Sequence, residues 1–313
     1  MSFASEVKNE LSRVWPEKKC CQLAEIAGFI RVAGSIGLAG GGKFNIILTS
    51  EDPAVIRHYK ALIHEYFNVD TTLSVGEAIS VGKKHSYSIT IDPDNRSEQI
   101  LRETGILLVR EGNNYISDGI YDGIVKSKCC KRSYLRGVFM GNGTMSDPEK
   151  AYHLEFVCHT EAFARDLRKL INSFVDLQAK EYKRGKTYVV YMKKADYVGD
   201  TLGIMGADTH SLIIENTLVE KSVRNDANRL ANCDNANVDK IVEAAMKQVQ
   251  AIAKIEQTKG LGWLPEKLRE TAILRKENPD ISIAALGEMC DPPLKKSGIN
   301  SRLRKIEELA SKL

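Results

Sequence analysis

The sequence predicts an α+β protein whose pseudo-twofold N-terminal body, residues 1–212, is joined by a linker at 213–222 to an all-α domain at 223–313. Three observations support this prediction. A long stretch occurs twice with its motifs in the same order. Each copy mixes strand-like alternation of apolar residues with helical spacing, and beyond the second copy only helical spacing remains. The chain of 313 residues, 43% hydrophobic, is long enough for two packed domains.

The repeat is clearest where adjacent cysteines begin each copy. Residues 19–36 align without a gap with residues 128–145. The matched pairs are Cys20 with Cys129, Cys21 with Cys130, Gly28 with Gly137, and Gly34 with Gly143. Two further blocks follow in the same order, beginning at Phe44 and His153, and at Ser86 and Thr187. Three blocks in one order indicate a duplicated unit, with copies at about 1–106 and 107–212.

Each copy is predicted to contain a helix, two strands, a helix, a strand pair and a last helix. Alternation at Tyr87, Ile89 and Ile91 predicts a strand with one buried face. The spacing of Leu167 and Leu170 predicts an amphipathic helix in the second copy. The N-terminal segment, which begins before the first copy's cysteines, also has the pattern of an amphipathic helix rather than a signal peptide.

The cysteine-flanked helices, residues 23–33 and 134–142, are predicted to pack against each other at the pseudo-twofold axis. Close packing of two helices needs small residues at the contact, and Gly28 and Gly137 supply them. We therefore interpret these glycines as packing residues.

Residues 26–34 and 135–143 resemble the nine-residue LAGLIDADG motif of a family of homing endonucleases. In that family the paired motif helices form the interface between half-domains, and the acid at the eighth position holds a divalent metal ion. The eighth positions here are Ala33 and Asn142, which cannot act as anionic ligands. Metal-assisted cleavage of a phosphodiester requires oxygen ligands, usually carboxylates. The resemblance thus implies the endonuclease scaffold without catalytic residues.

The whole arrangement is similar to the WhiA family, in which a degenerate LAGLIDADG body precedes a DNA-binding domain. The most specific parts are the adjacent cysteines, the Asn-rich segment 224–237 and the C-terminal segment 294–310. This resemblance implies a bacterial transcription factor that acts in sporulation, or in cell division and chromosome segregation. It also implies a cytoplasmic, nucleoid-associated protein whose partners are promoter DNA and a protein of the transcription machinery.

A helix-turn-helix is predicted near the C-terminus. Ser282 can cap a short helix, the turn at 291–293 reverses the chain, and Ser297 opens the last helix. An exposed Asn and Arg near the start of that helix suit the major groove, because Arg can bind guanine and Asn adenine. The predicted DNA-binding residues are Lys295, Lys296, Ser297, Asn300, Ser301, Arg302, Arg304 and Lys305. The alternative is an ordinary helical bundle with a basic exposed helix.

Two apolar stripes define the predicted packing of this domain. The last helix carries its stripe at Ile299, Leu303, Ile306 and Leu309. An earlier helix, capped by Asn237, carries another at Val238, Ile241, Val242, Ala245, Val249 and Ile252. Both stripes are predicted to face a common helical core.

The net charge of +4 does not by itself indicate a nucleic-acid partner, but the basic residues are clustered at 126–136, 180–194 and 295–305. Such clusters can neutralise phosphates, or they can be solvated faces. The possible additional DNA contacts are Arg224, Asn228, Arg229, Lys183, Arg184 and Lys186. The Asn-rich segment could equally serve as helix caps.

No metal ion or cofactor is predicted. The seven cysteines include two adjacent pairs and no C-x-x-C, which indicates structural thiols in a reducing compartment. The glycine-rich stretch 37–43 resembles a phosphate-binding loop, but it follows a helix and Phe44 stands where Ser or Thr would bind magnesium, so we interpret it as a turn. No apolar run is long enough for a membrane span. The competing functions are an active metal-dependent endonuclease and a module that assembles with a protein partner.

Overall fold

The structure is a computed structural model, and it describes residues 2–41, 43–76 and 86–313. These residues form two compact units, Met1–Glu220 and Lys221–Leu313, and each is described separately. None of the helices in the described ranges combines the length and the apolar character that a membrane span requires.

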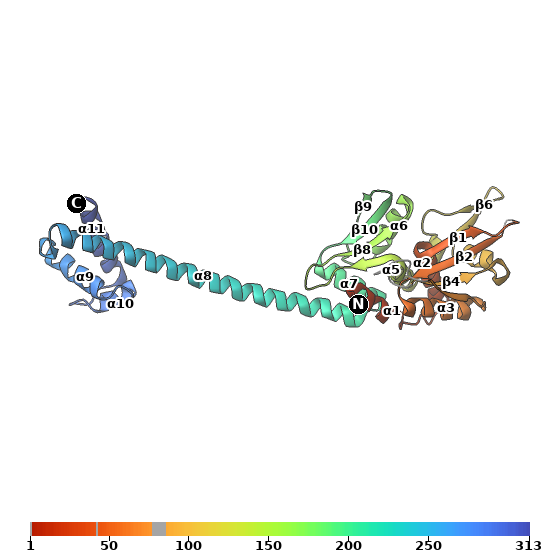
Figure 1. The fold of residues 1–313 in the computed structure, drawn as a ribbon, viewed down its shortest axis with the longest axis horizontal. Helices are drawn as coiled ribbons and strands as arrows, with labels where there is room; N and C mark the ends of the chain where they lie inside the picture. The colour runs from red at the N-terminus through yellow and green to blue at the C-terminus, as the bar shows by residue number, and fades with distance from the viewer. Residues whose placement is uncertain (1, 42, 77–85) are drawn as a thin grey trace. The chain divides into compact units, whose positions relative to one another are not determined.

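The first unit confirms the duplication (Figure 1). After α1 (Phe3–Leu11), the first repeat comprises α2 (Lys19–Ala33), β1 (Gly34–Leu38), β2 (Phe44–Ser50), α3 (Pro53–Phe67), β3 (Thr72–Gly76), β4 (Ser86–Ile91), the 3₁₀ turn η1 (Pro93–Asn95) and α4 (Ser97–Glu103). The second comprises α5 (Lys128–Asn142), β7 (Gly143–Met145), β8 (Leu154–Cys158), α6 (Glu161–Ile171), β9 (Lys180–Arg184), β10 (Thr187–Met192) and α7 (Ala195–Met205). Between them lie the hairpin β5 (Leu107–Arg110) and β6 (Asn113–Ile116) and the turn η2 (Asp122–Ile124).

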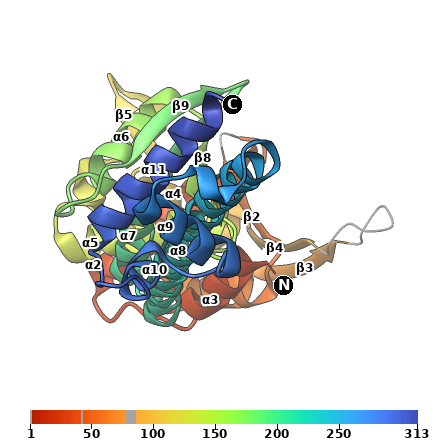
Figure 2. The same ribbon diagram turned by 90° about the vertical axis from the view of Figure 1, so that its left-hand side faces the viewer.

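Both repeats build the same antiparallel sheet. The strand orders are β1-β2-β4-β3 and β7-β8-β10-β9, so corresponding strands occupy corresponding places. Figure 2 shows β2, β4 and β3 of the first sheet side by side. Gly37 and Leu38 of the glycine-rich stretch end β1, and its described residues after Leu38 belong to the turn between β1 and β2, where the Ala39 amide donates to the Lys43 carbonyl over 2.9 Å. The interpretation of this stretch as a turn is confirmed for its described residues after Leu38.

Local sequence explains where α3 and α6, the helices that pack on the two sheets, begin. Asp52 accepts a hydrogen bond from the Ala54 amide at the start of α3, with Pro53 in the first turn. Thr160 accepts one from the Phe163 amide at the start of α6. Each helix then buries its apolar face against its own sheet, since alternate strand residues such as Ile46 and Phe156 are fully buried.

The helices α2 and α5 pack against each other through their glycines, as the sequence predicts. A Cβ atom on Gly28 would overlap the Tyr134 carbonyl of α5, and one on Gly137 would overlap the Glu25 carbonyl of α2. The backbones approach so closely that only glycine fits at either position. Phe29 and Phe139 are fully buried beside this contact.

A buried ion pair also joins the two repeats. The Glu25 side chain on α2 is fully buried, and its Oε2 accepts hydrogen bonds from Arg136 on α5, with Nε at 2.9 Å and Nη2 at 2.6 Å. His58 Nε2 on α3 lies 2.8 Å from Glu25 Oε1. The Arg136 Nη1 donates to the Met205 carbonyl, so each charged group is satisfied within the interface.

The second unit contains most of α8 (Asp208–Thr258), the 3₁₀ turn η3 (Leu261–Trp263), α9 (Glu266–Glu277), α10 (Ile283–Glu288) and α11 (Lys296–Ser311). Its core is formed by apolar side chains of all four helices. Among the fully or almost fully buried residues are Ile252, Ile255, Ala272, Leu286, Ile299, Leu303 and Ile306. The last helix therefore packs through the apolar stripe that the sequence predicts.

The course of α8 corrects two predictions. The residues 213–222, predicted as a linker, are helical, and Asn237 lies inside the helix instead of capping it. The segment 208–258 contains no Gly or Pro, so nothing in it interrupts the helical hydrogen bonds. Only part of the stripe predicted after Asn237 is buried: Ile252 is fully buried, whereas Val238 is 55% exposed.

Candidate nucleic-acid interface

The helices α10 and α11 form the predicted helix-turn-helix. Ser282 caps α10 by accepting a hydrogen bond from the Ala285 amide over 3.2 Å, as predicted. The connecting loop returns against α10, where the Leu294 amide donates to the Gly287 carbonyl over 2.8 Å. A Cβ on Gly287 would overlap the Leu294 carbonyl, so this glycine permits the close return. The residue that precedes α11 is Lys295, and Ser297 lies within the helix rather than at its start.

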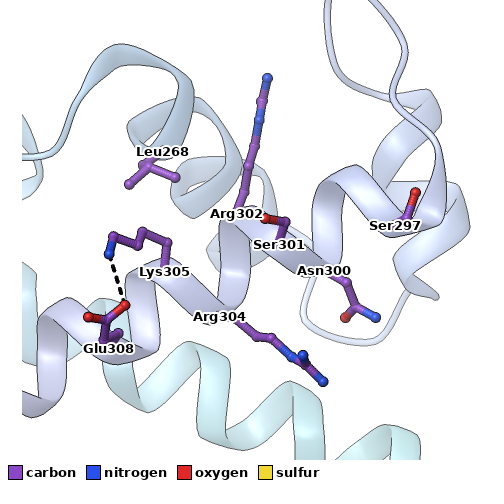
Figure 3. A pocket seen from close by; sticks show the side chains of 8 residues that line it. All are labelled: Leu268, Ser297, Asn300, Ser301, Arg302, Arg304, Lys305 and Glu308. Atoms are coloured by element: carbon purple, nitrogen blue, oxygen red, sulfur yellow. Dashed lines mark hydrogen bonds and ion pairs between the residues drawn. The ribbon is translucent and has the colours of Figure 1, made fainter.

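The exposed face of α11 carries most of the predicted DNA-binding side chains. Lys295, Lys296, Ser297, Ser301, Arg304 and Lys305 are exposed, and Asn300 is half-buried. Several of them line a surface pocket, and in Figure 3 Asn300 and Arg304 project from the same side of α11. These two residues are four apart, which places an amide and a guanidinium on adjacent turns of one helix face.

Arg302 is held differently from its neighbours. Its Nη1 donates to the Lys267 carbonyl and to Glu270 Oε2, both over 3.1 Å, and to Thr271 Oγ1 over 3.2 Å. Only 18% of its side chain is exposed. The guanidinium predicted to meet DNA is therefore bonded to α9, where it fixes the position of α11.

Lys305 is paired with an acid of its own helix. Its Nζ lies 2.9 Å from Glu308 Oε2, and Lys312 Nζ lies 2.8 Å from Glu308 Oε1. The hydrogen bonds from Lys312 and Lys305 lower the pKa of Glu308 to about 2. The carboxylate thus stays ionised at neutral pH and partly offsets the charge of Lys305, whereas Arg304 stands on the exposed face (Figure 3).

The additional predicted contacts lie on two separate elements. Arg224, Asn228 and Arg229 are exposed on α8. Arg184 ends β9, and its Nη1 lies 3.1 Å from Glu155 Oε1, so a carboxylate already holds it. Lys186 lies in the turn after β9.

The register of the second sheet separates the predicted residues by face. Lys183 pairs with Tyr188, which shares the helix-covered face with buried Cys158, and its Nζ lies 5.8 Å from the Tyr188 ring centroid. Lys183 therefore belongs to a different face from Arg184, because directly opposed and alternate strand residues share one side of a sheet.

The opposite, outer face of this sheet carries residues that were not predicted as site residues. Tyr182 and Tyr191 form an edge-to-face pair with ring centroids 5.4 Å apart, and Lys193 Nζ lies 5.2 Å from the Tyr191 centroid. Lys180 pairs directly with Tyr191. The sequence of β9 could have predicted this cluster, because Lys180, Tyr182 and Arg184 are alternate residues of one strand and therefore share one face of the sheet.

The two eighth motif positions lie at the ends of α2 and α5. A Cβ built on Gly141 would lie 3.4 Å from the Ala33 Cβ, so the two helix ends are adjacent. Asn142 Nδ2 donates to the Val157 carbonyl over 2.9 Å, which ties the end of α5 to β8. One position thus offers a methyl group and the other an amide that already has a structural partner.

A cysteine cluster lies at the opposite ends of the same helices. The Sγ atoms of Cys20, Cys21, Cys129 and Cys130 all lie within 4.8 Å of one another. The Ser127 hydroxyl, 3.1 Å from Cys129 Sγ, and next the neighbouring Cys21 thiol are the main causes that lower the pKa of the Cys129 thiol to about 7. The spacing within each cysteine pair does not predict this cluster. The cluster could have been predicted from the alignment of the two copies, because the matching cysteine pairs begin two helices that pack against each other.

Three family descriptions match successive parts of the chain. Residues 19–107 match the WhiA N-terminal LAGLIDADG-like domain, residues 131–224 the WhiA LAGLIDADG-like domain, and residues 227–310 the WhiA C-terminal HTH domain. The fold and the candidate site together thus define a class, a LAGLIDADG homing-endonuclease-like body followed by a helix-turn-helix domain.

Relatives match over the full length. The chain is 44% identical to the probable cell division protein WhiA of Alkaliphilus oremlandii and 43% identical to that of Thermoanaerobacter pseudethanolicus, covering 100% of this chain and 98% of each relative. The crystal structure of full-length WhiA from Thermatoga maritima superposes with a TM-score of 0.59 at 26% identity, covering 100% of this chain and 99% of that one. The chain belongs to the WhiA family.

Proposed function

We propose that this protein is a sequence-specific DNA-binding transcriptional regulator that reads promoter DNA through α11. The observation that carries the proposal is the exposed face of α11, where Arg304 and Asn300 lie one turn apart on a helix that α9 and α10 hold in place. A helix supported in this way can enter the major groove, where an Arg and an Asn distinguish guanine and adenine. The domain that binds DNA would be residues 223–313.

The side chains divide into three proposed roles. Asn300, Arg304 and Ser301 would face base edges. Lys295 and Lys296, exposed at the start of α11, would meet phosphates and set the register. Ser297, in the first turn, would contact the sugar-phosphate backbone, and so would Lys305. Arg302 would act indirectly, because its bonds to α9 position the helix.

The cellular role rests on the relatives. The WhiA proteins of Alkaliphilus oremlandii and Thermoanaerobacter pseudethanolicus are named as probable cell division proteins. We propose that this chain regulates genes of cell division and chromosome segregation, or of sporulation, as a nucleoid-associated protein of the cytoplasm. A protein of the transcription machinery would then be its partner at the promoter.

The experiment is enrichment of genomic DNA fragments by the full chain, compared with Arg304→Ala. We expect the wild type to enrich particular promoters and the variant to lose about 1–3 kcal/mol of specific binding free energy. The matched control is Lys247→Ala, which removes one exposed positive charge from α8 in the same unit. Equal enrichment by wild type and Arg304→Ala would contradict the assignment to α11.

We also propose that the chain does not cleave DNA. Ala33 offers no ligand and the Asn142 amide is bonded to Val157, so the two positions lack the carboxylates that would hold a divalent ion beside a phosphate. Incubation of the full chain with supercoiled plasmid and Mg²⁺ or Mn²⁺ tests this directly. Metal-dependent nicking that persists through purification would overturn it and favour an active endonuclease.

A further inference from the structure

The cluster of Cys20, Cys21, Cys129 and Cys130 is the one group of potential metal ligands with such close spacing among the described residues. All four thiols are free. They come from the first turns of α2 and α5, two helices that belong to different repeats and pack against each other along their length. The duplication thus brings two cysteine pairs, 109 positions apart in sequence, to one place.

We propose that these four cysteines form a structural site for a thiophilic metal ion, with zinc as the expected occupant. Zinc in structural sites is bound tetrahedrally by four ligands at about 2.3 Å, which separates the sulfur atoms by about 3.8 Å. The Sγ atoms lie within 4.8 Å of one another, so small side-chain rotations are sufficient to close the site. Four sulfur ligands and no oxygen ligand select zinc over magnesium or calcium.

The surroundings favour bound thiolates. Both helices present their N-terminal ends to the cluster, where the helix dipole stabilises negative charge. Neither helix has an acidic residue in its first turn, and Lys18 and Lys128 lie close to the cysteine pairs in the chain, whereas Lys19 is paired with Glu65. Lys18 and Lys128 offset part of the net negative charge that four thiolates leave on a divalent ion.

The site also has the second shell and the access that metal sites require. Ser127 Oγ lies 3.1 Å from Cys129 Sγ and 3.0 Å from Cys130 Sγ, where its hydroxyl can donate to a bound sulfur. Cys20 is exposed, and a surface pocket opens beside Cys129. Cys21 and Cys130 are buried, which leaves two of the ligands screened from solvent.

The expected consequence is a metal bridge between the repeats. It would join the N-terminal ends of α2 and α5, whereas Ala33 and Asn142 lie at the opposite ends. The bound metal would therefore fix the interface of the first unit without taking part in phosphate chemistry, and its removal would lower the melting temperature of that unit.

The test is metal analysis of the full chain, purified under reducing conditions with an affinity tag that binds no metal. We expect one zinc per chain by mass spectrometry. Replacement with Co²⁺ should produce the visible absorption of tetrahedral cobalt and an intense thiolate-to-cobalt band near the ultraviolet. No zinc and no cobalt band would overturn the proposal.

The variant Cys20→Ser/Cys129→Ser tests the ligands, because these two side chains are not buried and their replacement should leave the fold intact. It should lose the zinc, the cobalt band and the zinc-dependent rise in melting temperature. The control is Cys233→Ser, which removes an exposed thiol on α8 outside the cluster and should keep all three. Zinc retained at full stoichiometry in the double variant would show that the metal is bound elsewhere.

Discussion

The two repeats of the first unit share one topology but expose different chemistry on their outer sheet faces. On the first sheet, the outer residues of the described strands are uncharged: Ser35, Gly37, Asn45, Ile47, Thr49, Thr72, Ser74, Gly76, Ser86, Ser88 and Thr90. On the second sheet, the outer face carries Lys180, Tyr182, Arg184 and Tyr191. The inner faces are alike, with Ile46 and Phe156 both fully buried.

This difference shows which parts of a duplicated unit are constrained by packing. A core position tolerates little change in volume, and a glycine at a helix crossing tolerates none, so both are retained in the two copies. Many outer strand positions are open to solvent, although Val189 on the outer face of β10 is fully buried. A residue at a solvent-exposed position can change with little loss of stability, so the two faces can acquire separate functions.

The interface between the repeats is itself asymmetric. Glu25 of α2 corresponds in the alignment to Tyr134 of α5, and Arg136 of α5 corresponds to Ala27 of α2. The buried pair of Glu25 and Arg136 therefore occurs once, not twice. The crossing glycines are symmetric, and the charges that fix the relative position of the two helices are not.

Removal of the Glu25 carboxylate, which occurs in only one repeat, should have the largest effect on the free energy of unfolding. Glu25→Ala would leave Arg136 buried without its partner and should destabilise the first unit by about 3–5 kcal/mol. Urea unfolding of the full chain, followed by circular dichroism, measures this loss. The control is Glu161→Ala at the exposed pair with Arg165, where about 0–1 kcal/mol is expected. Similar losses in both variants would show that the buried pair has no special role.

A methyl group at Gly28 or Gly137, the glycines at the helix crossing, should have the next largest effect on stability. Gly28→Ala and Gly137→Ala would each force the two helices apart, at a cost of about 1–3 kcal/mol. In contrast, Gly203→Ala in α7 meets only Ser211 Oγ at 3.6 Å and should stabilise slightly, because Ala favours a helix over Gly. Melting temperatures of the three variants distinguish the crossing from general helix propensity, since opposite signs are expected.

The outer faces provide a test of function. If the second sheet binds nucleic acid without sequence preference, Lys180→Ala/Lys193→Ala should reduce the slope of log affinity against log salt by about 2 for random duplex DNA. Thr72→Ala/Ser74→Ala on the first sheet should leave the slope unchanged. An unchanged slope in the lysine variant would assign DNA binding to the second unit alone and favour a protein partner for this face.

The smallest expected effect concerns α1, which precedes only the first repeat. Glu10 on α1 accepts hydrogen bonds from the Thr209 amide over 2.8 Å and from the His210 amide over 3.3 Å, and so caps α8. Burial raises the pKa of Glu10, but the hydrogen bonds from His210 and Thr209 outweigh it, so the pKa lies below its usual value of 4.5.

The direction of the pH effect on stability follows from this lowered pKa. The ionised Glu10 contributes stability in full above the unfolded pKa of 4.5, and that contribution is lost as the pH falls through the lower folded pKa. We expect Glu10→Gln to be less stable than the wild type at pH 7 and to approach it below pH 4.5. Thermal unfolding at a series of pH values measures the difference. A constant difference at every pH would exclude the linkage.

Much of the fold follows from local patterns. The duplication, the glycines at the helix crossing, the Ser282 cap and the apolar stripe of α11 were all predicted, because periodicity and caps involve residues close together in the chain. The boundaries of α8 were not predicted. Asn237 was predicted to cap the start of a helix, but it lies within α8, where no Gly or Pro interrupts the helical hydrogen bonds.

The candidate site was predicted less completely. The exposed face of α11 followed from its stripe, because burial of one face determines which residues remain on the other. The role of Arg302 did not follow, since its three acceptors lie on α9, more than 30 residues away in the chain. The same limit applies to the outer sheet face, where the aromatic and basic residues come together only through strand pairing.

The sequence by itself determined that this chain repeats one α+β unit, that its motif helices cross at glycines, and that both acid positions of the motif have lost their carboxylates. The tertiary structure alone decided that four cysteines meet at one end of these helices and that Arg302 is bonded to α9. The physical reason is that periodicity is encoded between neighbours in the chain. Contacts between distant side chains exist only once the helices and strands have packed.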